Sequence, residues 1–172
     1  MEEDVKSRLM LALVLVVVGL TAYAGSALAT PSAGFAGTTI AKATFGDLLS
    51  HVHSKTPQFW NEVIQTQGDS DLYVQQNTWQ PHGSTGWHTH PGPSFVIVTQ
   101  GSVTVYEGED ASCTPHVYTA NTANNSFVDI GGGDVHMIRN ETGAVAQTIA
   151  VQLIPAGATR RVDAEDPGHC SF

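Results

Sequence analysis

Hydrophobic and polar residues alternate with a period of two over most of the chain from Glu62 onward. This spacing is typical of β-strands with one buried face, because an amphipathic helix repeats every 3.6 residues instead. Gly and Pro separate the alternating runs at short intervals. The pattern predicts strands over residues 71–79, 94–100, 102–106, 116–119, 126–130, 135–139 and 144–154. Many short strands divided by turns indicate an all-β sandwich or barrel.

Two local features of this pattern carry separate predictions. Gly101 divides two strand-forming runs, and this arrangement predicts a β-hairpin. Residues 40–49 predict a first strand that ends at a Gly-Asp turn, although a short helix over residues 45–53 fits the same stretch. Residues 56–61 contain a proline and predict a loop.

The N-terminal region contains an apolar, uncharged tract over residues 9–29. It ends in Ala27-Leu28-Ala29, a small-x-small pattern that signal peptidase accepts, so residues 1–29 are predicted to be a signal peptide. The tract is also long enough to span a bilayer, and acidic residues before it are unusual for a signal peptide. A retained membrane anchor is therefore the alternative. Either interpretation places the folded part outside the cytoplasm, as a secreted or extracytoplasmic protein.

The remainder of the 172-residue chain is long enough for one domain. Residues 30–39 are mostly small and predict a flexible segment, and residues 40–172 predict the single folded domain. Cys113 and Cys170 are an even pair in an exported chain, so a disulfide is expected, with two unpaired thiols as the alternative.

The composition narrows the classes of partner. Hydrophobic residues make up 41% of the chain and charged residues 13%, a balance that argues against disorder. The formal net charge is −9, with only 7 Lys and Arg, whereas a nucleic acid requires a basic face. A small molecule is the expected partner. A membrane is expected only if the N-terminal segment is retained, and a homodimer is left open.

Three histidines form the candidate chemical site. His88 and His90 are two residues apart, so on an extended strand both imidazoles project to one face and can share a metal ion. A chance surface pair is the alternative, because a stable site needs a third ligand. His136 supplies that ligand, since it follows a glycine-rich turn at the start of another predicted strand.

The spacing around these histidines resembles the cupin family, whose motifs read G(x)5HxH(x)3-4E(x)6G and G(x)5PxG(x)2H(x)3N. The first motif is matched by His88, His90 and Gly101, with Ser94 in place of the glutamate. The second is matched by Gly133, His136 and Asn140, with Gly131 where the family usually has proline. The resemblance covers residues 72–154.

The resemblance implies a cupin-type jelly-roll β-barrel with a divalent transition metal on His88, His90 and His136. Because Ser94 replaces the family's anionic ligand, the site would hold its ion with three neutral imidazoles and water. The identity of the ion is left open among Fe, Zn, Cu, Ni and Mn. His82 is a further candidate neighbour of the metal, with an exposed loop histidine as the alternative.

The resemblance further implies a metal-dependent enzyme acting on a small molecule by an O2-dependent, dioxygenase-like oxidation. No catalytic residue is identified. The alternative is a non-catalytic extracytoplasmic binding module with a structural metal, because one fold can host many functions.

Overall fold

The structure is a computed structural model that describes residues 29–55 and 59–172. Within these ranges every regular element is a strand. The strands are β1 (Ala33–Phe45), β2 (Leu49–Ser54), β3 (Trp60–Gln65), β4 (Ser70–Ser84), β5 (His88–Thr89), β6 (Ser94–Gln100), β7 (Ser102–Glu107), β8 (His116–Thr119), β9 (Ser126–Asp129), β10 (His136–Arg139), β11 (Ala146–Pro155) and β12 (Val162–Asp163). No helix in the described part of the chain could cross a membrane.

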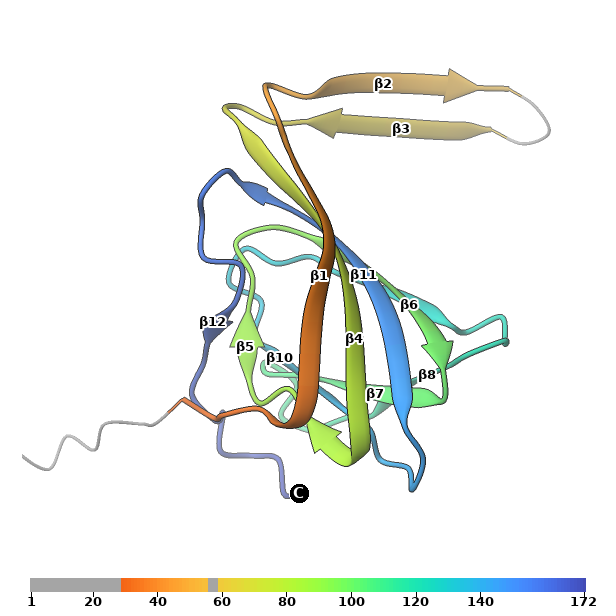
Figure 1. Cartoon of the computed structure of the whole chain (residues 1–172), viewed down its shortest axis with the longest axis vertical. Coiled ribbons are helices and arrows are strands. Elements are labelled where there is room, and N and C mark those ends of the chain that lie inside the picture. Colours follow the sequence, from red (N-terminus) through yellow and green to blue (C-terminus); the bar gives the residue numbers. More distant parts are fainter. Residues whose placement is uncertain (1–28, 56–58) are drawn as a thin grey trace, which may run out of the picture.

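Ten strands form one sheet that curls into a barrel (Figure 1). One wall follows the order β1-β4-β11-β6-β9, with antiparallel pairing throughout. The other wall contains β12, β5, β10, β7 and β8. The walls meet where Arg139 of β10 pairs with Ser84 at the end of β4. The all-β barrel expected from the sequence is confirmed.

Strict alternation along β11 and β6 creates the inner face of the barrel. In β11 every second residue from Ala146 to Ile154 is buried, and in β6 Ser94, Val96 and Val98 are buried while the residues between them are exposed. One end of the interior is apolar, with a core of Trp79, Val98, Val103, Val105, Ile138 and Ala146. Polar residues enter the interior further along the same strands, so the polar half of the barrel is where a site can form.

The predicted hairpin at Gly101 is wrong. β6 and β7 border this residue, but β6 pairs with β9 and β11 whereas β7 pairs with β8 and β10. Gly101 has a φ of 67°, so the chain turns a corner there and passes from one wall to the other. Local sequence identified both strands, but their partners are distant in the chain.

The N-terminal predictions need further correction. β1 begins at Ala33 and pairs with β4 along its length, so most of the segment 30–39 is strand rather than a flexible lead. The alternative helix over 45–53 is also wrong, because β2 and β3 form a two-stranded arm that projects from the barrel (Figure 1). β3 begins at Trp60, inside the predicted loop 56–61. The proposed signal peptide lies outside the described residues except for Ala29.

The predicted disulfide between Cys113 and Cys170 is present and closes a separation of 57 residues. It packs, with Val135 and Ala164, against a second core cluster of Trp87, Tyr106 and Met137. The C-terminal segment is thereby held against the wall that contains β5 and β10.

Candidate metal centre

Two neighbouring strands bring the three predicted histidines together. His88 begins β5, His136 begins β10, and the two residues are direct cross-strand partners. His90 follows β5 immediately. The ring centroids are 4.4 Å apart for His88 and His136, 4.9 Å for His88 and His90, and 5.4 Å for His90 and His136. One ligand atom from each imidazole lies within 4.8 Å of the other two, as a shared metal ion requires.

Backbone carbonyl groups orient these imidazoles. His88 Nδ1 lies 3.0 Å from the carbonyl oxygen of Gly86, and His90 Nδ1 lies 2.6 Å from that of Arg160. His136 Nδ1 has a longer contact, 3.4 Å, with the carbonyl oxygen of Asp134. A carbonyl oxygen only accepts, so Nδ1 carries the proton and Nε2 keeps the lone pair that binds a metal. All three histidines are thus held in the tautomer of an Nε2 ligand.

Burial keeps two of the imidazoles uncharged. His88 is 4% exposed, and burial, with smaller contributions from His136 and Arg161, lowers its pKa to about 2. Burial likewise lowers the pKa of His90. Neutral imidazole is the form that coordinates metals, so His88 and His90 fit a divalent transition ion without prior loss of protons. A three-histidine centre is therefore chemically consistent with the residues present.

Asp129 is a site residue that the sequence interpretation missed. It ends β9 and is the cross-strand partner of Ser94, and its side chain is buried. One carboxylate oxygen, Oδ1, accepts the N–H of Gly131 at 2.8 Å and lies 3.7 Å from His136 Nδ1. The other, Oδ2, lies 3.5 Å from His90 Nε2 and accepts no hydrogen bond from any residue that the structure describes. A carboxylate therefore adjoins the imidazoles, although the family's glutamate is missing. An acidic residue two positions before the glycine run that leads to His136 was the available signal.

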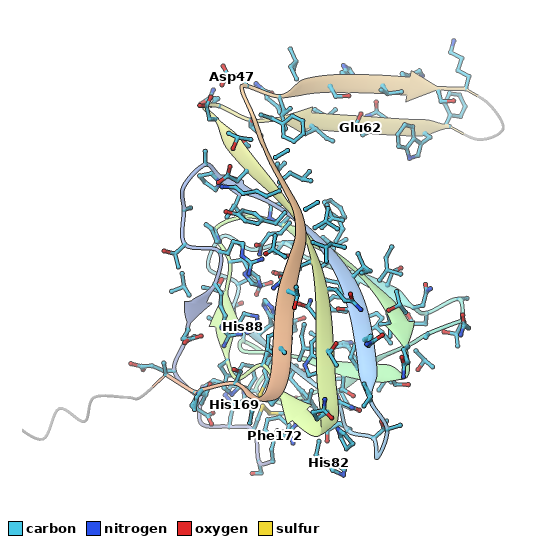
Figure 2. The ribbon with its side chains drawn as sticks, viewed as in Figure 1. Asp47, Glu62, His82, His88, His169 and Phe172 are labelled. Atoms are coloured by element: carbon cyan, nitrogen blue, oxygen red, sulfur yellow. A yellow bond between two sulfur atoms is a disulfide. The ribbon has the colours of Figure 1, made fainter. Side chains whose placement is uncertain are left out.

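The two additional candidates lie in different places. Ser94 is buried on the cavity wall, but its hydroxyl accepts a hydrogen bond from Gln152 Nε2 at 3.1 Å. His82 is exposed, has a φ of 60°, and lies at the far end of the barrel from His88 (Figure 2). The structure thus brings Ser94 to the site and does not bring His82 there.

The backbone at position 131 explains why glycine stands where the second motif usually has proline. It has a φ of 65°, which proline cannot adopt, and its Cα lies so close to the carbonyl group of Gly92 that a side chain would clash. The next residue, Gly132, donates its N–H to the carbonyl oxygen of His90 at 2.7 Å. This turn fixes the segment that carries His136 against the segment that carries His90.

The histidines line a cavity of about 200 Å³. Its walls also include apolar side chains such as Trp79, Val96 and Ile138. Most of the buried side-chain N and O atoms without a hydrogen-bond partner in the described residues line it: Asn77 Oδ1, Trp79 Nε1, Asp129 Oδ2, Gln152 Oε1 and Arg160 Nη1. Buried polar groups are ordinarily satisfied, so this concentration indicates a place where a ligand supplies the partners.

The barrel and its three converging histidines define a small all-β protein with a site competent to bind a metal. The all-β barrel and the three clustered histidines agree with the expectation drawn from the two motifs. No protein-family model matches the chain, and no curated protein sequence matches it.

Several solved structures resemble the chain at low identity. The polyketide cyclase RemF of Streptomyces resistomycificus has 20% identity and a TM-score of 0.44 over 56% of this chain and 64% of its own. A cupin superfamily protein of Desulfitobacterium hafniense has 9% identity and a TM-score of 0.41 over 68% of this chain and 81% of its own. Oxalate oxidase has 19% identity and a TM-score of 0.39 over 49% of this chain. The chain spans 46% of the length of oxalate oxidase and 64% of the length of the cyclase. At this level of similarity the comparisons say nothing about the activity of this protein.

Proposed function

We propose that this protein is an exported, metal-dependent cupin that oxidises a small molecule with O2. The observation that carries the proposal is the convergence of three oriented imidazoles on a cavity whose buried polar atoms lack partners. When bound, a redox-active ion such as Fe would supply the electron transfer to O2 that side chains alone do not provide.

The chain's own residues have distinct parts in this proposal. His88, His90 and His136 hold the ion. Asp129 Oδ2, buried and without a hydrogen-bond donor, accepts a proton or a hydrogen bond from the molecule in the cavity. Apolar side chains around it, including Trp79, exclude bulk water and so strengthen every polar contact inside.

Oxygen uptake by the reconstituted protein tests the proposal. Metal-free protein is loaded with Fe(II), and O2 consumption is followed with an electrode while a panel of small hydroxy, keto and amino acids is added. We expect uptake with at least one substrate, and its loss in Asp129→Asn at unchanged metal content. Full metal occupancy and ligand binding without O2 consumption would contradict the oxidation and favour the alternative, a non-catalytic binding module with a structural metal.

Export is proposed on separate grounds. The apolar tract that ends at Ala29 supports cleavage there, and the disulfide of Cys113 and Cys170 supports an oxidising compartment. N-terminal sequencing of protein from a secreting host is expected to begin at Thr30. A membrane-bound product that retains Met1 would instead favour the anchored alternative.

A further inference from the structure

Arg160 places a cationic side chain at the cavity of the candidate metal centre. It lies between β11 and β12, in the C-terminal segment that covers β5, and it lines the same cavity as the three histidines. Its backbone carbonyl oxygen accepts the Nδ1–H of His90 at 2.6 Å, so its main chain is fixed beside the site. Its guanidinium carbon lies 5.0 Å from the centroid of the Tyr73 ring, which restricts the side chain further.

The charge of Arg160 has no counter-ion in the part of the chain that the structure describes. Among residues 29–55 and 59–172 no carboxylate lies within ion-pair distance of it, and Nη1 is buried without a hydrogen-bond partner. The adjacent Arg161 differs, because its Nε pairs with Asp163 at 2.6 Å and its Nη2 donates to the carbonyl oxygen of Thr85 at 2.6 Å. Of the cavity's two arginines, only Arg160 has a buried guanidinium nitrogen without a hydrogen-bond partner among the described residues.

The carboxylates of Asp71 and Asp129 have other neighbours than Arg160. Asp71 pairs with Lys42 at 2.9 Å and accepts the N–H of Gly157 and the hydroxyl of Thr44, at 3.0 Å and 2.6 Å. These contacts hold the pKa of Asp71 well below its ordinary value, so this carboxylate is ionised and committed to Lys42. Asp129 faces the histidines. A buried guanidinium N–H without a partner is costly, and an anionic ligand would remove that cost.

The remaining unpartnered atoms describe the rest of the ligand. Asn77 Oδ1, Gln152 Oε1 and Asp129 Oδ2 are acceptors that match hydroxyl or amino groups. Trp79 Nε1 is a donor, so it matches a further acceptor on the ligand. The cavity of about 200 Å³ is smaller than the roughly 300–1,000 Å³ typical of pockets for drug-sized molecules. The ligand is therefore small and carries donors as well as an anion.

We propose that the substrate of this site is a small carboxylic acid bearing hydroxyl or amino groups, and that Arg160 binds its carboxylate. The inference rests on the proposed function, because it specifies the substrate class of that same cavity. Arginine suits this task because its planar guanidinium offers parallel N–H donors that match the two oxygens of a carboxylate.

Calorimetric binding to the metal-loaded, disulfide-intact protein tests the proposal. The probes are acetate, lactate and succinate, each paired with its uncharged amide at constant ionic strength. At least one carboxylate is expected to bind about ten-fold or more tightly than its amide, as a charge-assisted hydrogen bond predicts. Arg160→Gln should remove most of that difference without changing metal content, and Arg160→Lys should retain part of it. Arg139→Gln is the matched control, since Arg139 pairs with Glu141 at 2.6 Å and does not line the cavity.

The outcomes separate the substrate class from the metal centre. If Arg160→Gln binds the carboxylates as tightly as the wild type, or if no carboxylate is preferred over its amide, the substrate proposal is overturned. Metal occupancy, measured on the same samples, stays intact in that case. Wild-type protein that holds no metal at these histidines would instead overturn the proposed function itself.

Discussion

Acid is predicted to destabilise the metal-free protein through its buried histidines. His88 has a pKa of about 2 in the folded protein and an ordinary value of 6.5 when unfolded. Below pH 6.5, His88 therefore binds a proton in the unfolded chain but stays neutral in the folded protein. The contribution of His88 to the free energy of unfolding is fully present above pH 6.5. It falls by about 1.4 kcal/mol for each pH unit below that value.

The pH window separates this effect from that of Asp71. Between about pH 6.5 and pH 5 the loss attributable to His88 is roughly 2 kcal/mol, and His90 adds to it in the same direction. Asp71, whose pKa is lowered, contributes stability that is lost only at lower pH, near and below its ordinary value of 3.8. A loss of this size is measurable against a total stability of about 5–15 kcal/mol.

Urea denaturation in the presence of a chelator, followed by tryptophan fluorescence at several pH values, measures this slope. His88→Gln is expected to reduce the slope below pH 6.5 by about 1.4 kcal/mol per pH unit, whatever its effect on absolute stability. His169→Gln, at an exposed histidine, is the reference variant for the loss of one imidazole. A His88→Gln protein with the wild-type slope would show that His88 is not held neutral by burial.

Three further substitutions test the supports of the site. Gly131→Ala should cost about 1–3 kcal/mol in urea unfolding and more than Gly132→Ala, because both glycines have positive φ but only Gly131 has backbone against it. Equal losses of stability in the two variants would refute the close contact between Gly131 and the backbone of Gly92. Replacing Cys113 and Cys170 by serine should lower stability by on the order of 4 kcal/mol, and a loss below about 1 kcal/mol would contradict the cross-link's role. Ser94→Glu should retain metal longer against a chelator, since it adds an anion near the ion; unchanged retention would mean that the new carboxylate does not reach it.

The cluster of three histidines was predictable because its sequence signal is local. The two-residue spacing of His88 and His90 survives in any extended strand, and the glycine run before His136 marks the start of another strand. The strands themselves were also largely predictable, since alternation reports which face is buried. Residues 116–119 form β8 with the bounds that the sequence predicts.

The remaining features depend on contacts between distant residues. Asp129 reaches the site only because β9 pairs with β6, and Arg160 only because the C-terminal segment folds over β5. The sequence around Gly101 could not show which strands pair with β6 and β7. A glycine with positive φ fits a hairpin turn as well as a corner between the two walls of the barrel. β1 was recognised only in part, because its small residues join the sheet through main-chain pairing with β4 rather than through an alternating apolar face.

Metal analysis of the purified mature protein tests the central claim most directly. The account predicts about one first-row transition ion per chain, with occupancy sharply reduced in both His88→Ala and His136→Ala and unchanged in His51→Ala, whose histidine lies on the projecting arm. Loss of the metal from His51→Ala but not from His136→Ala, or wild-type protein that binds no such ion when it is supplied, would contradict the account.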